Sequence, residues 1–334
     1  MTDTTDVLGQ AADWLSEGKK VALATVIGTW GSSPRPVGSQ LAVDDAGAFV
    51  GSVSGGCIEG AVVGEALNTI ADGKNRSLVF GVTNEQAWEV GLACGGDVRV
   101  LVEPADDPAT LERLNKEKPI ATVTDLTTGT KGFVTPASVT GELDLSDTMV
   151  SHARFALRDD RSRIYDEGDQ TYFVNIFNPP LRMAIIGAVH ISQALVPMAA
   201  MADFDVTVID PRGSFATETR FPEVTLSEDW PDDAMLEFSP DSRTAVVTLT
   251  HDPKLDDPAL EVALKSDAFY IGCLGSKRTH ASRLERLTEL GFGDKDFARI
   301  NGPVGLDLGA TSPAEIAVSI LGEIVAAKHG KLAG

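Results

Sequence analysis

The chain has 334 residues, of which 43% are hydrophobic and 23% are charged. That length exceeds one ordinary hydrophobic core, so we expect about two or three domains, and no apolar run is long enough for a transmembrane helix. The formal net charge of −21 repels nucleic acid and anionic membranes, so neither is an expected partner.

The chain contains three cysteines, Cys57, Cys94 and Cys273, which cannot all be paired with one another. Its first residues are acidic and polar, and they lack the basic and apolar regions of a signal peptide. Thiols without an export signal indicate a reducing compartment, so we expect a cytoplasmic protein.

Residues 1–105 are predicted to form an N-terminal domain of α/β or α+β type. In the segment 58–72 apolar residues recur at helical spacing and a glycine follows, which predicts a helix with one buried face. The other predicted elements are a helix over 5–17, a buried strand over 20–28, a hairpin over 40–54, and strands over 77–82 and 97–104.

Residues 106–180 are predicted to form a connecting helix and a small β-rich segment. The charged stretch 105–119 has a helical pattern, and short strand patterns alternate with turns from 120 to 180. This segment is either an insert or the closing strands of the first domain.

Residues 181–334 are predicted to form a Rossmann-like C-terminal domain. Strands alternate with helices along this part of the chain, which is typical of a doubly wound parallel sheet. Its last helix is predicted to begin at a capping box of Ser312 and Glu315, with Pro313 at the first helical position.

The turn after the first strand of this domain partly matches a dinucleotide-binding fingerprint. Gly187 occupies the first glycine position, but Val189 stands where a second glycine would let a pyrophosphate approach. Asp210 closes the next strand, where such domains carry a ribose-binding acid. His190 lies on the turn, and it is either a ligand contact or a structural histidine.

Two further loops follow strands of the same predicted sheet. His251 and Asp252 form either an acid–base pair or a turn in which Asp252 caps a helix. Ser276 and Lys277 stand at a predicted helix start, where backbone N–H groups favour an anion such as phosphate. We expect these loops and the glycine turn to converge on one sheet edge.

Two of the cysteines are flanked by paired glycines. Cys57 stands at the predicted start of helix 58–72, where unsatisfied N–H groups and the helix dipole favour a thiolate, and Cys94 lies on a similar turn. The alternative for both is a small buried residue. A thiolate suits a soft metal centre such as molybdenum, with Cys57 as the candidate ligand, whereas the spacing does not match a zinc site. The candidate contacts are Gly55, Gly56 and Cys57 at the first turn and Cys94, Gly95 and Gly96 at the second, and the sequence does not decide whether the two turns form one site.

The loop 29–40 is a second candidate contact in this domain. Arg35 lies between Pro34 and Pro36, which restrict the loop and aim the guanidinium at a phosphate or carboxylate. Gln40 adds a further donor at the end of the loop. The alternative is a rigid surface turn.

Several longer blocks occur in order along the chain, and together they resemble the XdhC/CoxI family of maturation factors for xanthine and carbon monoxide dehydrogenases. The blocks include GSSPRPVGSQLAV, GSVSGGCIEGAVVGEAL, EQAWEVGLACGGDVRVLVEP, NPPLRMAIIGAVHISQAL and GPVGLDLGATSPAEIAVSILGEI. The resemblance covers nearly the whole chain outside residues 105–170.

The resemblance implies an N-terminal XdhC/CoxI domain, a C-terminal Rossmann-like domain and the role of a chaperone rather than an enzyme. Such proteins bind molybdenum cofactor (molybdopterin) transiently, support its sulfuration with a cysteine desulfurase and deliver it to an apo-molybdoenzyme. Cys57 and Cys94 are then the candidates for contact with the molybdenum or a transferred sulfur. We expect a homodimer, and we assign no role to Cys273.

Two other functions are consistent with the residues. The first is a nucleotide-dependent oxidoreductase of the Rossmann class, which Gly187 and Asp210 favour. The second is a protein–protein adaptor for molybdoenzyme assembly that docks through its acidic surface. Affinity for nucleotides separates the first from the chaperone, and binding to a dehydrogenase polypeptide in the absence of any small molecule indicates the second.

Overall fold

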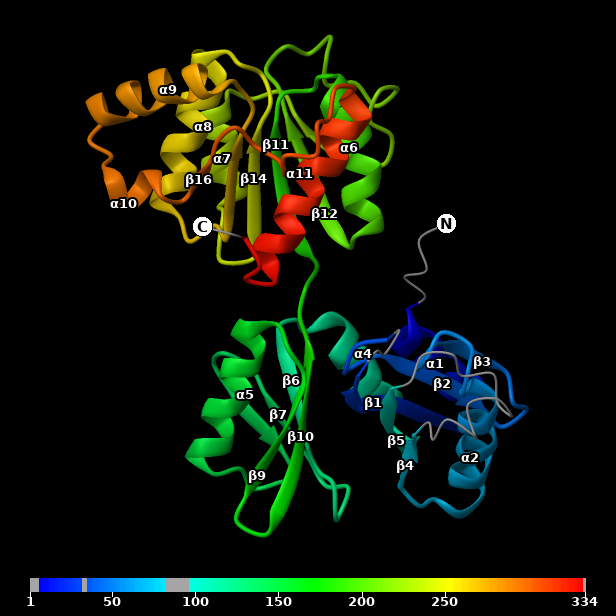
Figure 1. Ribbon diagram of the computed structural model, residues 1–334. Helices are drawn as coiled ribbons and strands as arrows, with labels where there is room; N and C mark the ends of the chain where they lie inside the picture. Colours follow the sequence, from blue (N-terminus) through cyan, green and yellow to red (C-terminus); the bar gives the residue numbers. More distant parts are fainter. Residues whose placement is uncertain (1–5, 32–34, 82–95, 333–334) are drawn as a thin grey trace. The chain divides into compact units, whose positions relative to one another are not determined.

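The computed structural model describes residues 6–31, 35–81 and 96–332. The chain divides into two compact units, one running to Pro179 and the other from Pro180 to the C-terminus (Figure 1). The first unit includes both the N-terminal segment and the middle segment that the sequence separates near residue 105. We propose that these two segments are distinct parts of the first unit, divided near residue 105.

The first unit begins with a five-stranded antiparallel sheet in the order β3-β2-β1-β5-β4. Alternate residues of its central strand, β1, lie on opposite faces, so Ala24 and Val26 pack beneath helix α2 while Leu23 packs against helix α1. The elements are α1 (Val7–Ser16), β1 (Val21–Trp30), β2 (Gln40–Asp44), β3 (Phe49–Gly51), α2 (Glu59–Asp72), β4 (Arg76–Phe80) and β5 (Asp97–Ala105).

Helix α2 forms close to the predicted range because one stripe of its surface is apolar. Val62 and Ala66 are fully buried in the cluster that includes Val26 of β1. The helix ends at Gly73, whose φ of 70° lies in the left-handed region that glycine adopts without strain.

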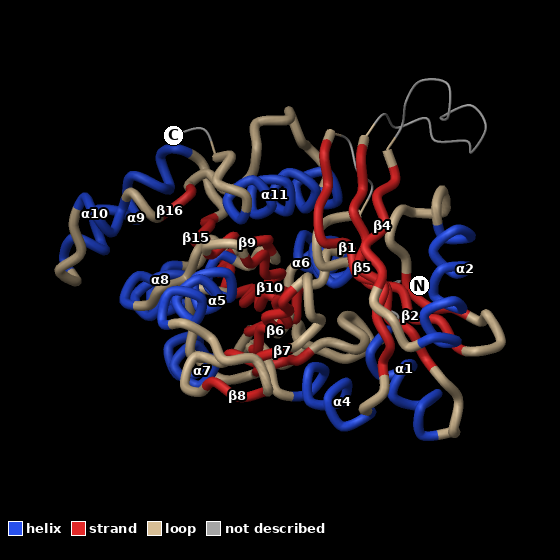
Figure 2. The backbone as a smooth tube through the Cα atoms, turned by 90° about the horizontal axis from the view of Figure 1, so that it is seen from below, coloured by secondary structure: helices blue, strands red, loops and turns tan. Residues whose placement is uncertain are grey.

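A second five-stranded antiparallel sheet completes the first unit, in the order β8-β7-β6-β10-β9 (Figure 2). It packs against the first sheet through shared apolar clusters, in which Phe173 of β10 joins Ile27 and Leu101 of the first sheet. The elements are α4 (Pro108–Lys116), β6 (Ile120–Asp125), β7 (Lys131–Val134), β8 (Val139–Gly141), α5 (Asp147–Asp159), β9 (Arg163–Glu167) and β10 (Gln170–Phe177).

The prediction of strands and turns throughout 120–180 is wrong for helix α5. Ser146 caps this helix by accepting a hydrogen bond from the backbone N–H of Met149 at 3.0 Å. Its buried stripe includes Met149, Ala153 and Leu157, which are spaced by four residues. The stripe contains small alanines, and charged residues lie between its members. Its periodic hydrophobic pattern is therefore weaker than the patterns of the strands that flank it.

The second unit is a doubly wound α/β domain, as predicted. All neighbouring strands in its six-stranded sheet are parallel, in the order β13-β12-β11-β14-β15-β16. This is the strand order 3-2-1-4-5-6 of dinucleotide-binding sheets. The strands are β11 (Leu181–Ile186), β12 (Phe204–Ile209), β13 (Thr225–Ser227), β14 (Thr244–Thr248), β15 (Tyr270–Cys273) and β16 (Ile300–Asn301).

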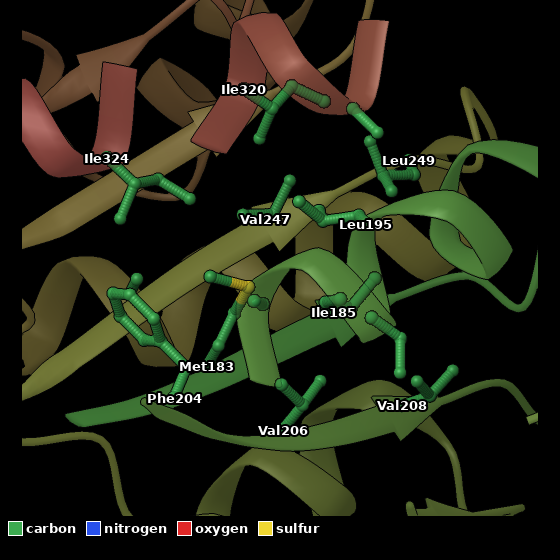
Figure 3. Close-up of a cluster of buried hydrophobic side chains, with 14 of the residues drawn as sticks. Met183, Ile185, Leu195, Phe204, Val206, Val208, Val247, Leu249, Ile320 and Ile324 are labelled. Carbon is green, nitrogen blue, oxygen red and sulfur yellow. The ribbon is translucent and has the colours of Figure 1, made fainter. Parts of the chain in front are cut away.

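Helices cover both faces of this sheet, which explains why its central strands are apolar throughout (Figure 1). On one face Met183 and Ile185 of β11 pack with Leu195 of α6 and Ile320 of α11 (Figure 3). On the other face Ile186 packs beneath α7, α8 and α9. The helices are α6 (His190–Met201), α7 (Pro231–Phe238), α8 (Pro253–Lys265), α9 (Lys277–Glu289), α10 (Asp294–Phe297) and α11 (Pro313–Lys328).

The predicted start of the last helix is confirmed. Ser312 is the N-cap of α11, its Oγ accepts a hydrogen bond from the backbone N–H of Glu315, and the Glu315 carboxylate accepts one from the backbone N–H of Ser312. Across the described ranges, the helices are all too short or too polar to cross a bilayer.

We expect Leu195→Ala in α6 to lower the free energy of unfolding by about 2–5 kcal/mol, because it leaves a cavity in the core of the second unit. Leu195 is fully buried, whereas Met201 of the same helix is 66% exposed. Met201→Ala is therefore the matched control, with an expected change within about 0.5 kcal/mol. Urea denaturation measures both, and equal losses would contradict the assigned core.

Candidate functional site

The loop before α2 is organised by one carboxylate, that of Glu59, the first residue of the helix. Glu59 is buried, and one of its oxygens, Oε1, accepts hydrogen bonds from the Ser52 hydroxyl (2.7 Å) and from the backbone N–H groups of Val53, Ser54 and Gly55. Its other oxygen, Oε2, accepts from the Ser54 hydroxyl (2.6 Å) and from the backbone N–H of Gly56 (2.8 Å). The carboxylate thus holds every residue from 52 to 56.

These hydrogen bonds decide the ionisation of Glu59. Burial by itself would raise its pKa, but the bonds from Ser54, Ser52 and the backbone outweigh burial and lower the pKa from 4.5 to about 2. The side chain is therefore a permanent anion at neutral pH. Sequence reasoning did not identify Glu59, although a glutamate in the first turn of a helix after paired glycines is a recognisable signal.

The glycines in this loop are required by their backbone conformation. Gly55 and Gly56 have φ angles of 81° and 118°, which residues with a side chain rarely adopt, and both glycines are exposed. A Cβ placed on Gly56 would meet no atom within 4 Å, so the space beside it is open. The N–H groups of both glycines already donate hydrogen bonds to Glu59. A ligand beside Gly56 would therefore contact the exposed backbone rather than these two N–H groups.

Cys57 lies one residue before the N-cap of α2 rather than within the helix. Its backbone N–H donates to the Ser54 hydroxyl at 3.1 Å, and its half-buried thiol side chain packs against the apolar cluster beneath α2. Among the residues that the structure describes, no group of three or more His, Cys, Asp or Glu side chains is arranged to hold a metal. Cys57 therefore offers a single soft ligand.

The strand register places the other predicted contacts of this unit at the same end of the first sheet. Trp30, where β1 ends, pairs with Asp97, where β5 begins, and β4 ends at Phe80 opposite Val98 (Figure 2). The loop that carries half-buried Arg35 follows β1, and half-buried Gly96 directly precedes β5. Cys94 and Gly95 lie outside the described residues.

Gln40 does not share a face of the sheet with Cys57. Its Nε2 donates to the hydroxyl of Thr25 at 3.3 Å, and both side chains line a cavity on the far side of the sheet. Thr25 alternates along β1 with Ala24 and Val26, which pack in the same cluster as Cys57. The sequence left open whether Gln40 and Cys57 belong to one site, and the pleat places their side chains on opposite faces of the sheet.

In the second unit, Gly187 is required by a close approach between two loops. Its φ is 109°, and a Cβ there would meet the side chain of Thr250, in the loop after β14, at 2.6 Å. The Ser192 hydroxyl donates to the Gly187 carbonyl, which fixes the turn against α6. Gly187 thus allows the turn after β11 to pack closely against the loop after β14.

Asp210 closes this glycine turn instead of facing outward. It is fully buried, and its Oδ2 accepts from the backbone N–H of Ala188 at 2.8 Å and from the Arg212 guanidinium at 2.7 Å. Its Oδ1 accepts from the backbone N–H and from Nε of Arg212. Burial raises its pKa, but Arg212 and the backbone N–H groups lower it further, so the net shift is downward. Both oxygens are engaged within the protein.

The remaining predicted contacts lie at the carboxyl edge of the parallel sheet. His190 begins α6 and is exposed, and exposed His251 has a φ of 61°, an uncommon conformation for a residue other than glycine. Ser276 caps α9 by accepting from the backbone N–H of Thr279 at 3.1 Å, and exposed Lys277 follows it. Asp252 caps α8, which matches the alternative of a helix-capping turn.

A buried ion pair that the sequence did not reveal joins two of these loops. Asp256 of α8 and Arg283 of α9 are both buried, with carboxylate and guanidinium 3.6 Å apart. Asp256 accepts a hydrogen bond from the Thr250 hydroxyl at 2.6 Å, and Arg283 donates to the Leu274 carbonyl at 3.0 Å. Burial is the largest effect on Asp256 and raises its pKa. The pair fixes the loops that follow β14 and β15.

The fold and these sites define a two-unit protein whose Rossmann domain closes its glycine turn with its own carboxylate. Family models match both units: the XdhC and CoxI family over residues 14–81 and the XdhC Rossmann domain over residues 183–324. The chain belongs to the XdhC/CoxI family.

Individual relatives are similar over nearly the full length. The chain is 28% identical to the molybdenum cofactor insertion chaperone PaoD of Escherichia coli, with 98% of this chain and 89% of the relative covered. It is 27% identical to a probable xanthine dehydrogenase subunit of Bacillus subtilis, with 93% and 94% covered. A crystal structure described as a xanthine dehydrogenase from Bacillus halodurans matches with a TM-score of 0.77 and 25% identity, covering 99% of this chain and 97% of that one.

We expect Glu59→Gln to lower the free energy of unfolding by about 1–3 kcal/mol at neutral pH, because an amide cannot accept all the hydrogen bonds of the loop. Glu65→Gln is the matched control on the same helix, since within the described ranges Glu65 forms one partly exposed ion pair, with Arg76, and loss of such a pair costs at most about 1 kcal/mol. Urea denaturation measures both. Equal values for the two variants would contradict the role of Glu59.

The same network predicts a pH dependence. Because the pKa of Glu59 is lowered from 4.5 to about 2 on folding, its contribution is fully present above about pH 4.5 and is lost as the pH falls toward 2. Amide hydrogen exchange of residues 53–56 should therefore be better protected in the native protein than in Glu59→Gln at pH 6, and the difference should shrink as the pH approaches 2. A difference that stays constant would exclude ionised Glu59 as the cause.

Because both carboxylate oxygens of Asp210 are engaged within the protein, we predict weak nucleotide binding. We expect NAD(H), NADP(H), ATP and CTP to bind no more tightly than millimolar, because the ribose-binding acid already bonds Arg212 and Val189 occupies the pyrophosphate approach. Isothermal titration calorimetry on the full chain measures this. A micromolar dissociation constant for any of the four would restore the oxidoreductase hypothesis.

Proposed function

We propose that this chain is a maturation factor that binds molybdenum cofactor as its cargo and delivers it to an apo-molybdoenzyme of the xanthine dehydrogenase type. Family membership supports this, as do two full-length relatives, one named a molybdenum cofactor insertion chaperone and the other a probable xanthine dehydrogenase subunit. The remaining support comes from the loop before α2.

The observation that carries the proposal is a thiol held beside exposed glycines. The Glu59 carboxylate fixes the backbone of residues 52–56, and the Ser54 hydroxyl fixes the N–H of Cys57. A sulfur ligand is positioned in this way before any cargo arrives, which reduces the entropy lost on binding. The space beside Gly56 is open, so a bulky group can approach the backbone of the residue that precedes Cys57.

The chemistry of these residues fits the cargo. A cysteine thiolate is a soft donor of the kind that molybdenum and a transferred sulfur both accept. Arg35 lies in the loop that leaves the same end of the sheet, where a guanidinium suits the phosphate of the pterin. Because the net charge of −21 repels anions at long range, such a contact has to be local.

The finer steps of the proposal concern sulfur and partners. We propose that Cys57 and Cys94 contact the molybdenum or the sulfur that a cysteine desulfurase supplies. We also propose that the chain binds the cofactor transiently and that it forms a homodimer. The strands that flank the segment 82–95 end at the same edge of the sheet as the Arg35 loop, which supports one shared site.

We expect Cys57→Ala and Cys94→Ala each to lower the amount of molybdenum cofactor that the protein retains by about tenfold or more, because even loss of an outer-shell partner of a metal ligand costs about 10–100-fold in metal affinity. Cys273→Ala is the matched control, because Cys273 is fully buried in the core of the second unit. Metal analysis and pterin fluorescence of the purified, loaded protein measure the retained cofactor. Equal loading of all three variants would overturn the thiol assignment.

Delivery needs a separate measurement. Loaded protein mixed with an apo-dehydrogenase of the xanthine dehydrogenase type should restore that enzyme's activity, and unloaded protein should not. Failure to bind the cofactor at all would overturn the chaperone function itself.

A further inference from the structure

Helix α11 buries its polar side chains, which is the reverse of an ordinary surface helix. Within residues 316–327 the polar side chains are Ser319 and Glu323, and both are buried. The Glu323 carboxylate accepts hydrogen bonds from the Tyr270 hydroxyl and from the backbone N–H of Gly305 at 2.9 Å. The Ser319 hydroxyl donates to a carbonyl of its own helix at 2.8 Å. The polar groups of this helix are thus directed into the second unit.

The outer surface of α11 is apolar instead. Val318 and Val325 are exposed and lie two turns apart on the same side of the helix, with partly exposed Leu321 and Gly322 between them. Exposed Leu306, from the preceding loop, lies beside Gly322, since a Cβ on this glycine would meet its Cδ1 at 3.1 Å. We call these five residues the α11 patch. A helix that is apolar on both its inner and outer sides is typical of a helix that is covered on both.

The sequence around the α11 patch is almost free of charge. Inward-facing Glu323 is the one charged residue within 316–327. The neighbouring helix α6 packs on the same face of the sheet, and residues 190–201 that form it contain no Asp, Glu, Lys or Arg (Figure 1). A net charge of −21 makes two copies of this chain repel each other. An uncharged surface is where two such copies can approach at the lowest electrostatic cost.

The two ends of α11 carry opposite charges in a symmetric arrangement. Glu315 in the first turn and Lys328 in the last turn are equally far along the chain from the Leu321–Gly322 peptide, and so are Val318 and Val325. Antiparallel pairing of two copies of the helix about this peptide sets each Val318 against Val325 of the other copy. It also brings each Lys328 to the end at which the other Glu315 stands, and it joins opposite ends of the two helix dipoles. The patch therefore complements itself.

We propose that the α11 patch is the contact between two copies of this chain, which pair α11 on α11 in antiparallel orientation about a twofold axis at the Leu321–Gly322 peptide. A twofold contact uses the same surface on both copies, so it requires a patch that complements itself. The inference rests on the homodimer of the proposed function and names the surface that forms it.

The test is sedimentation equilibrium of the full chain without molybdenum cofactor. We expect a wild-type dimer, and we expect Val318→Asp and Val325→Asp each to weaken dimerisation by at least about tenfold, because each dimer then holds two like charges in an apolar contact. Leu236→Asp is the matched control, since Leu236 is an exposed leucine of α7 on the other face of the sheet. This variant should dimerise as the wild type does, and circular dichroism checks that all three variants are folded.

A cross-link tests the antiparallel arrangement. Val318→Cys chains mixed with Val325→Cys chains should react with a short bis-maleimide to give a link between these two positions, which mass spectrometry of the linked peptides identifies. Each variant alone should give much less, because two turns of helix then separate the paired cysteines. Equal linking of each variant alone and of the mixture would overturn the antiparallel pairing.

The outcomes separate this inference from the proposed function. A monomeric wild-type chain would overturn both the α11 contact and the proposed homodimer. A dimer that both aspartate variants leave intact would overturn the α11 contact alone. A monomer that binds an apo-dehydrogenase polypeptide, and loses it in Val318→Asp, would assign the patch to that partner and overturn the present inference. Since dimerisation is measured without cofactor, it does not depend on whether the chain is a cofactor chaperone.

Discussion

The candidate cofactor site depends on the hydrogen bonds that the carboxylate of Glu59 accepts from the loop before α2. Residues 52–56 contain two successive glycines in left-handed conformations, so the loop has little stiffness of its own. Glu59 lies one turn away on α2 and accepts six hydrogen bonds from this loop. Because the carboxylate stays ionised when buried, its bonds are charge-assisted and strong. The position of Cys57 follows from that anchor.

The second unit uses the same device with a different outcome. Asp210 accepts a bond from the backbone N–H of Ala188 in the glycine turn, and it is held in turn by the guanidinium of Arg212. In the first unit the internal carboxylate leaves exposed glycines and a thiol accessible at the loop. In the second unit it occupies the position from which a Rossmann domain would bind a ribose. A strongly acidic chain thus uses two of its carboxylates to complete its own backbone turns.

The pleat of the first sheet separates two chemically different regions. Alternate residues of β1 face α2 or the second sheet, so the Cys57 loop and the cavity that Thr25 and Gln40 line lie on opposite sides of one layer. One side offers a soft ligand and open space beside glycine. The other side offers the Thr25 hydroxyl and the Gln40 amide. Neighbouring residues of β1 therefore belong to different regions.

The sequence by itself determined the doubly wound sheet, helix α2 and the capping box of α11, because each depends on local spacing and end signals. It did not reveal helix α5, whose small buried residues give a weak periodic signal. Only the tertiary structure decided the partners of Glu59 and Asp210 and the face on which Gln40 lies. Those outcomes depend on which buried carboxylate reaches which backbone N–H and on how strands pair, and residue spacing does not encode either.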